Sequence, residues 1–171
     1  VGADAFYGGA GIDTVSYETA AAGITLHMNE AASSYTGDAQ GDTFDGIEAA
    51  RMTSYADDVL VLADGITIYG GSGDDFLNTW ALDVAFYGEG GNDTLWGDTG
   101  DDLLDGGDGG DEISGYGGND TIYGGAGNDT LYADDGDDVL IGGAGADAFY
   151  GGAGIDTVNY ETATTGITIH M

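Results

Sequence analysis

Apolar residues recur every nine positions through the second half of the chain. Read in blocks of nine from Gly70 to Asn159, the sequence gives ten units with no insertion or deletion. In positions six to nine the pattern alternates, which predicts a short strand whose eighth residue faces a core while the seventh and ninth face outward. The eighth position is apolar in every unit: Leu77, Phe86, Leu95, Leu104, Ile113, Ile122, Leu131, Leu140, Phe149 and Val158.

Glycine and aspartate hold two further positions of the nine. The fourth is Gly and the sixth is Asp in nine of the ten units, and the exception is 79–87, which has Leu82 and Val84 there. Positions one to five are too rich in Gly for a helix or a regular strand, and suit a turn with positive φ or close backbone approach. Each unit therefore predicts one turn and one strand of about four residues. Two units make a coil of 18 residues with a strand on each of two faces.

The pattern G-G-x-G-x-D-x-U-x resembles the nonapeptide of the RTX (repeats-in-toxin, hemolysin-type) calcium-binding family. The segments GGAGNDTLY at 124–132 and GGAGIDTVS at 8–16 match it fully, and the resemblance covers 1–16 and 70–159. It implies an all-β fold, a right-handed parallel β-roll (a β-solenoid) with 18 residues per coil and calcium ions in the turns. It also implies type I secretion and an extracellular or cell-surface location.

The composition agrees with bound cations. The chain has 32 acidic residues and one basic residue, Arg51, for a net charge of −31. Such a charge alone predicts disorder, but 42% of the residues are hydrophobic and can form a core if cations neutralise the carboxylates. The same charge disfavours binding to nucleic acid and to anionic membrane surfaces.

We expect no enzymatic activity from these residues. There is no Cys or Lys, which removes thiolate and Schiff-base chemistry and the phosphate-loop lysine. His27 and His170 are the same position in two copies of one segment, and we expect both at the surface rather than as catalytic bases. No nucleophile elbow is present.

Units 18 residues apart should lie on the same edge of the roll, so that their aspartates stack and repel one another unless a cation lies between them. Calcium takes six to eight oxygen ligands, which two carboxylates and about four turn carbonyls supply. Magnesium demands a tighter octahedron, and the nitrogen and sulfur ligands that zinc and copper prefer are scarce or absent. The alternative is that these aspartates only cap turns.

The resemblance implies about seven or more ions, each held by a pair of aspartates. On one edge the pairs are Asp75/Asp93, Asp93/Asp111, Asp111/Asp129 and Asp129/Asp147, and on the other Asp102/Asp120, Asp120/Asp138 and Asp138/Asp156. Turn carbonyls would come from Gly70, Gly71, Gly73, Gly88, Gly91, Gly106, Gly109, Gly124, Gly125, Gly127, Gly142, Gly143 and Gly145.

At four other positions the sequence limits where further ions could bind. The turn at 52–55 lacks glycine, which argues against a site between Asp57 and Asp75. Val84 should remove the site that would pair with Asp102. We expect Asp4 and Asp13 to bind an ion only with neighbours outside this sequence or with residues of their own coils.

A longer repeat overlies the nine-residue one. Residues 1–28 recur at 144–171 with 23 of 28 positions identical, an offset of 143. This favours tandem copies in a longer protein, and the alternative is two diverged copies at the ends of one domain. Residues 1–16 are predicted to be nonapeptides that end a preceding block, and 17–51 a strand and loop insertion. Residues 52–69 are degenerate nonapeptides that continue the solenoid or cover one face. Residues 70–159 form the ten regular units, and 160–171 begin the next 143-residue unit.

Three functions fit these features. The first is a calcium-stiffened extracellular repeat of a secreted adhesin, surface layer or filament, whose partners are neighbouring copies of the same repeat. The second is a non-catalytic accessory module of a secreted enzyme or toxin, which aids secretion, folding or substrate holding. The third is a polysaccharide-binding module that uses the outward Tyr and Trp rows, for which the alternative is ordinary cross-strand packing.

Overall fold

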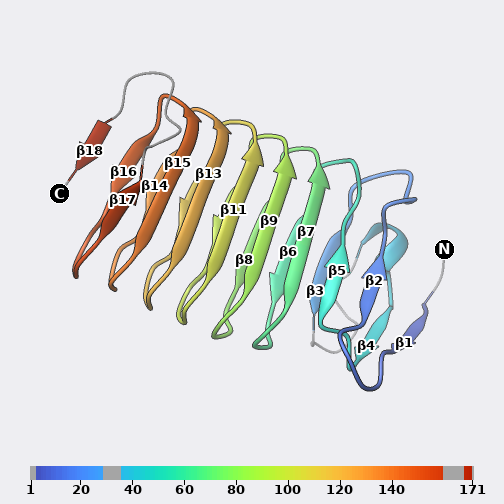
Figure 1. Cartoon of the computed structure of the whole chain (residues 1–171). Helices are drawn as coiled ribbons and strands as arrows, with labels where there is room; N and C mark the ends of the chain where they lie inside the picture. Colours follow the sequence, from blue (N-terminus) through green and yellow to red (C-terminus); the bar gives the residue numbers. More distant parts are fainter. Residues whose placement is uncertain (1–2, 29–35, 160–167, 171) are drawn as a thin grey trace.

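The computed structural model describes residues 3–28, 36–159 and 168–170, and almost all of its regular structure is parallel strand. Two eight-stranded sheets face each other, and the chain passes from one to the other as a flattened coil (Figure 1). Paired residues in successive coils are 18 positions apart, as for Leu104 and Ile122. The predicted all-β solenoid is therefore confirmed.

The first sheet, called sheet I below, has the order β17-β15-β13-β11-β9-β7-β5-β2. Its strands are β2 Thr14–Ser16, β5 Ala49–Arg51, β7 Thr67–Ser72, β9 Ala85–Gly90, β11 Leu103–Asp108, β13 Thr121–Gly127, β15 Val139–Gly145 and β17 Thr157–Asn159.

The second sheet, sheet II, has the order β18-β16-β14-β12-β10-β8-β6-β3. Its strands are β3 Thr25–Met28, β6 Asp58–Val61, β8 Phe76–Thr79, β10 Thr94–Trp96, β12 Glu112–Ser114, β14 Thr130–Tyr132, β16 Ala148–Tyr150 and β18 Thr168–His170. A separate two-stranded sheet joins β1 Ala5–Tyr7 to β4 Thr43–Asp45, and one 3-10 turn, η1, covers Gly37–Ala39.

The strands of sheet I continue into the glycine turns. The strands β7, β9, β11, β13 and β15 are six or seven residues long, and Gly125 pairs with both Gly107 and Gly143. The prediction that positions one to five form only a turn is therefore wrong for this sheet. Because all these turns have the same shape, the backbone can bend at Gly125, where φ is 104°, and still pair with the turns above and below it.

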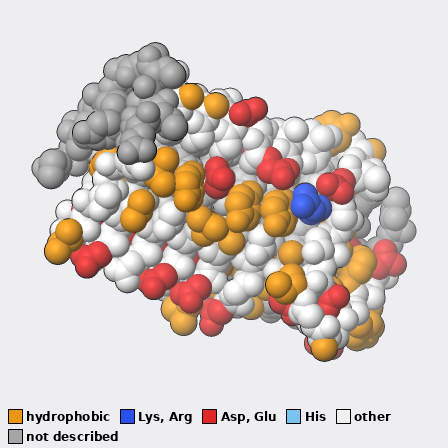
Figure 2. All heavy atoms as spheres, in the orientation of Figure 1, with side chains coloured by type: hydrophobic (Ala, Val, Ile, Leu, Met, Phe, Trp, Pro, Cys, Tyr) orange, Lys and Arg blue, Asp and Glu red, His pale blue; other side chains and the backbone are white. Residues whose placement is uncertain are grey.

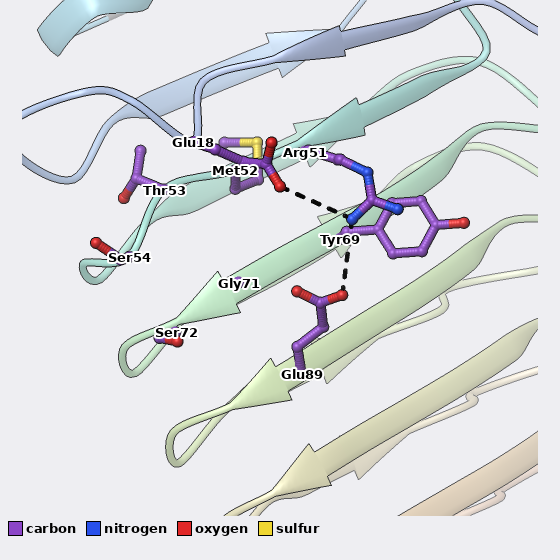
Figure 3. A pocket seen from close by; sticks show the side chains of 9 residues that line it. All are labelled: Glu18, Arg51, Met52, Thr53, Ser54, Tyr69, Gly71, Ser72 and Glu89. Carbon is purple, nitrogen blue, oxygen red and sulfur yellow. Dashed lines mark ion pairs between the residues drawn. The ribbon is translucent and has the colours of Figure 1, made fainter.

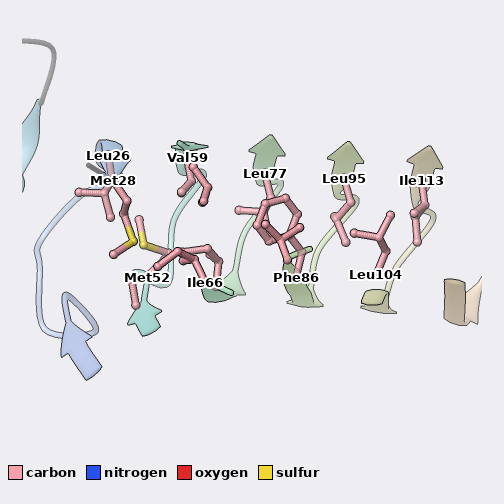
Figure 4. Close-up of a cluster of buried hydrophobic side chains, with 14 of the residues drawn as sticks. Leu26, Met28, Met52, Val59, Ile66, Leu77, Phe86, Leu95, Leu104 and Ile113 are labelled. Carbon is pink, nitrogen blue, oxygen red and sulfur yellow. The ribbon is translucent and has the colours of Figure 1, made fainter. Parts of the chain in front are cut away.

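The core is a double row of eighth-position side chains between the sheets (Figure 4). Leu95 of sheet II and Leu104 of sheet I are completely buried, and the same holds for the other predicted core residues from Leu77 to Phe149. Val158 packs against this core and is partly buried. Toward the N-terminus the core continues with Val59, Ile66 and Ile68, which are apolar positions of the degenerate units in 52–69. It also includes Leu26, Met28, Met52 and Val61, which the nine-residue pattern does not specify.

The interruption of the repeat still adds strands to the stack. The predicted insertion, 17–51, contains β3 and η1. The chain then returns as β4 and β5, which pair with β1 and β2, while β3 pairs with β6. The degenerate stretch 52–69 supplies β6 and the beginning of β7.

The predicted start of a further unit at 160–171 lies largely outside the described residues, where only β18 is placed, by its backbone pairing with β16. Within the part of the chain that the structure describes, no helix has the length and apolar character needed to cross a membrane.

Candidate metal sites

The sixth-position aspartates are buried along both edges of the roll. Asp93, on one edge, and Asp120, on the other, each expose 1% of their surface. Burial of an ionised carboxylate costs free energy unless hydrogen bonds or a cation compensate it. The same burial applies to the other members of the two rows except Asp156, which is half-buried: Asp75, Asp102, Asp111, Asp129, Asp138 and Asp147.

One oxygen of each carboxylate connects successive coils. The backbone N–H of Asp75 donates a 2.8 Å hydrogen bond to Oδ1 of Asp93, which lies 18 residues later. We call this repeated bond the carboxylate ladder. On the first edge it runs from Asp57 to Asp147, and on the second from Val84 to Asp156.

The other oxygen is left without a hydrogen bond. Oδ2 of eight ladder aspartates is buried and has no hydrogen-bond partner among the described residues, and Oδ2 of Asp13 shares this property. A buried anionic oxygen without a hydrogen bond is unfavourable, and a bound cation would offset this cost, since no donor among the described residues reaches the oxygen. The eight are Asp75, Asp93, Asp102, Asp111, Asp120, Asp129, Asp138 and Asp147.

First-position glycines leave room beside these oxygens. A Cβ atom added to Gly70 would lie 2.5 Å from Oδ2 of Asp75 and 2.9 Å from the carbonyl oxygen of Gly88. The same two kinds of oxygen flank Gly124. Any side chain here would fill a space lined by one carboxylate and one carbonyl oxygen, which are the ligand types that calcium binds.

Glycines of the second edge have the same surroundings. Gly97 lies beside Oδ2 of Asp102 and the carbonyl of Gly115, and Gly115 lies beside Oδ2 of Asp120. The sequence analysis did not single out Gly97 and Gly115 as sources of carbonyl ligands. Both stand at the first position of their units, so the signal was present in the repeat itself.

A sequence profile of the RTX calcium-binding nonapeptide repeat, which spans four copies, matches residues 1–15, 67–81, 87–122, 105–140 and 123–158. Together these segments cover more than half of the chain. The chain belongs to the RTX calcium-binding nonapeptide repeat family. The nonapeptides of this family bind calcium. A search of curated proteins found no match.

Burial changes the acidity of the RTX aspartates. It raises the pKa of Asp75 to about 8 and that of Asp102 to about 7, and the nearby carboxylates add to the increase. The hydrogen bond from the backbone to Oδ1 acts in the opposite direction. For Asp93, Asp120 and Asp129, burial raises the pKa to about 6. A cation in this RTX ladder therefore competes with protons.

No group of three or more His, Cys, Asp and Glu side chains that could hold a metal ion occurs in the described residues. The oxygens beside Gly70 are of a different kind, because one belongs to the carboxylate of Asp75 and the other to the backbone carbonyl of Gly88 in the next coil. The residues present thus fit calcium through the repetition of the turn, and not through a local cluster of side chains.

The carboxylate ladder also passes through the interruption, where the sequence analysis missed two members. The N–H of Asp4 donates to Oδ1 of Asp42 at 2.8 Å, and the N–H of Asp13 donates to Oε2 of Glu48 at 3.0 Å. The bonded residues are separated by 38 and 35 positions instead of 18, so a search at the fixed spacing of 18 does not find these pairs. These acids could have been found from their local sequence, because an acidic residue stands two positions before a residue that packs against the core, as in Asp42-Thr43-Phe44.

Asp57 and Val84 begin the two regular rows in different ways. Both oxygens of Asp57 are hydrogen-bonded, because Oδ2 accepts from the N–H and the hydroxyl of Thr53 and Oδ1 accepts from the N–H of Ile24. Val84 donates its N–H to Oδ1 of Asp102, but its buried side chain has no oxygen to offer an ion.

The outward face of sheet I carries a row of aromatic side chains that ends at Arg51. Figure 2 shows a band of hydrophobic side chains across this face, beside the one basic side chain of the chain. The guanidinium carbon of Arg51 lies 4.2 Å from the ring centroid of Tyr69, whose ring stacks on Tyr87 at 5.0 Å. Since β7 lies between β5 and β9, both faces of the Tyr69 ring are covered by neighbours. Tyr69 is therefore engaged in cross-strand packing.

A hollow of about 250 Å³ lies beside Arg51 (Figure 3). Arg51 Nη1 lies 4.0 Å from an oxygen of Glu18 and 3.9 Å from one of Glu89. All three side chains are substantially exposed, so these ion pairs contribute little to stability. The lining of the hollow includes Thr53, which donates hydrogen bonds to the ladder residue Asp57.

Proposed function

We propose that this chain is a calcium-dependent structural repeat, which folds and stiffens when calcium binds, and that it has no catalytic role. The observation that carries the proposal is the row of eight buried Oδ2 atoms that no donor among the described residues reaches. Without a cation, a folded roll would hold these carboxylates stacked and unsatisfied. Ion binding energy then becomes folding energy.

Seven ions would occupy the links between successive aspartates. Four lie on the edge from Asp75 to Asp147 and three on the edge from Asp102 to Asp156, with carbonyl ligands from the glycine turns. Seven divalent cations would offset about half of the net charge of −31. Calcium suits this site better than magnesium, because a site of six to eight flexible oxygens departs from the tight octahedron that magnesium demands.

We further propose that the chain is part of a tandem array in a secreted adhesin, surface-layer or filament protein. The supporting observation is that the second copy of the repeated segment continues the stack. The strand β16 repeats the sequence of β1, yet it pairs with β14 in the same parallel register as the regular units pair. The strand β17, the copy of β2, likewise pairs with β15. Neighbouring copies would then join end to end.

The test of calcium-coupled folding is a calcium titration followed by far-UV circular dichroism, with calorimetric ion counting and magnesium as the control. The expected result is a cooperative gain of strand signal with about seven ions bound and little response to magnesium. A chain with its full strand content in chelator would contradict the proposal.

The test of the array uses a chain with a second 143-residue copy added in frame. In calcium, small-angle scattering should show a single rod of about twice the length. Two units that tumble independently would contradict the end-to-end model.

A further inference from the structure

We propose that the hydroxyl groups of Tyr17 and Thr53 take the place of calcium at two links of the carboxylate ladder, so that the N-terminal end of the roll holds its fold when calcium is removed. The proposal rests on the calcium sites proposed above for the regular units, because it concerns two ladder acids whose second carboxylate oxygen accepts a hydrogen bond from a hydroxyl group. These acids are Asp42 and Asp57.

At Asp57 the hydroxyl comes from the same turn. Oδ2 of Asp57 accepts hydrogen bonds from the hydroxyl and the N–H of Thr53, both at 2.9 Å. Oδ1 accepts from the N–H of Ile24 at 2.7 Å. The carboxylate of Asp57 is as buried as that of Asp75, but only that of Asp75 has an Oδ2 without a partner.

At Asp42 the hydroxyl comes from a distant part of the chain. The Tyr17 hydroxyl donates a 2.6 Å hydrogen bond to Oδ2 of Asp42, 25 residues later, and the N–H of Asp4 donates to Oδ1 at 2.8 Å. Tyr17 and Asp42 are both buried. The Tyr17 ring is held edge-on to Phe6, with centroids 6.5 Å apart.

In both links a proton donor points at the oxygen that is free elsewhere in the ladder. A calcium ion would have to displace that donor, and at Asp57 it would also meet a turn, 52–55, without the glycines that leave room beside Asp75. A buried carboxylate with all its hydrogen bonds made is stable without a cation. We therefore assign no calcium ion to Asp42 or Asp57.

The apolar packing around these links is also independent of the calcium turns. Phe6 stacks on Phe44 at 5.7 Å, and the buried side chains of β3 and β6 belong to the same core. The strand β6 then presents an edge on which β8 pairs in parallel. The N-terminal end can thus serve as a preformed base on which the calcium-dependent coils stack.

The test is hydrogen exchange, followed by mass spectrometry, on the full chain in chelator and in calcium. In chelator, peptides from 43–61 should retain slow exchange while peptides from 121–150 exchange at the rate of an unfolded chain. In calcium both regions should be protected. Equal, fast exchange of the two regions in chelator would overturn the proposal.

Variants locate the effect in the hydroxyl groups. Thr53→Val removes the hydroxyl and keeps the side-chain shape, and Thr53→Ser keeps the hydroxyl as the matched control. In chelator, Thr53→Val should speed exchange of 43–61 by about tenfold or more, while Thr53→Ser changes it little. Tyr17→Phe tests the other link in the same way. Unchanged exchange in both Thr53→Val and Tyr17→Phe would overturn the proposal.

The calcium response of 121–150 separates this proposal from the one it rests on. All variants should still gain protection of 121–150 in calcium, which also shows that they fold. If 121–150 gains no protection in the unmodified chain, the proposed calcium sites are wrong, whereas loss of the difference between Thr53→Val and Thr53→Ser contradicts only the role of the hydroxyl.

Discussion

The backbone N–H of Asp93 donates a 2.8 Å hydrogen bond to Oδ1 of Asp111, while Oδ2 of the same Asp111 carboxylate is buried without a hydrogen-bond partner in the described residues. The two oxygens of the Asp111 carboxylate therefore have different roles. Oδ1 fixes the distance between successive coils, and Oδ2 is left for an ion. This division recurs in all eight ladder aspartates whose Oδ2 is buried without a partner, so under the proposed calcium sites loss of the ions should unfold these links.

Asp111→Asn should remove a ligand from two successive calcium sites, those shared with Asp93 and with Asp129. The amide keeps the size of the side chain but turns one oxygen into an NH₂ group, which cannot bind calcium. Calorimetry should count about two fewer ions, and the calcium midpoint for folding should rise. The matched control is Asp108→Asn, an exposed position in the preceding turn, which should change neither value. An unchanged ion count in Asp111→Asn would contradict the shared-ligand arrangement.

Gly124→Ala should block a calcium site by filling the space beside it. The added Cβ would lie 2.5 Å from Oδ2 of Asp129 and 2.7 Å from the carbonyl of Gly142, distances that real Cβ atoms do not adopt. We expect the loss of one ion and weaker folding in a calcium titration. Gly110→Ala is the control, since its nearest atoms lie at 3.4 Å. Equal effects of the two substitutions would show that the space beside Gly124 has no special role.

Without calcium, the folded chain should be more stable in mild acid than in weak base. Burial raises the pKa of Asp75 from 3.8 to about 8, so the folded state binds more protons than the unfolded state between these values. The stability from this group is complete below the unfolded pKa and is lost as the pH rises through the folded pKa. Metal-free protein should show more strand signal by circular dichroism near pH 5 than near pH 8.5.

Saturating calcium provides the control for this pH dependence. The ions then occupy the oxygens that would otherwise take protons, so calcium binding should weaken as the pH falls. More strand signal near pH 8.5 than near pH 5 in metal-free protein would contradict the assigned direction of the shifts.

Arg51→Gln should have a small effect, although it removes the one basic side chain of the molecule. The ion pairs with Glu18 and Glu89 are exposed and long, and the contact with Tyr69 lies on the surface. We expect a loss of no more than about 1 kcal/mol in the free energy of unfolding, measured in calcium by denaturant titration, and an unchanged ion count. A changed ion count would show that the hollow beside Arg51 is coupled to the calcium sites.

The nine-residue pattern predicted a stack of strands on two faces, because the apolar eighth position has the same role in every unit, while the parallel β-roll was implied by the resemblance to the RTX family. Leu95 and Leu104, nine residues apart, are buried from opposite sheets as that spacing requires. The pairing of glycine turns, as at Gly107 and Gly125, was missed because strand propensity is low for glycine. In the roll this low propensity is overcome by stacking of identical turns.

The ladder inside the interruption could not be predicted from spacing. Asp42 and Glu48 follow their partners by 38 and 35 residues, since the insertion adds chain between two coils without leaving the stack. The contact of Tyr17 with Asp42 joins residues that share no local pattern. It depends on how the insertion folds, and only the three-dimensional structure shows it.

The most direct test of calcium in the carboxylate ladder is a crystal structure of the calcium-loaded chain with anomalous scattering data. We predict an ion at 2.3–2.6 Å from Oδ2 at each regular link between Asp75 and Asp147 and between Asp102 and Asp156. We predict none at Asp42 or Asp57. A folded roll whose regular Oδ2 atoms face only protein or water would contradict the account.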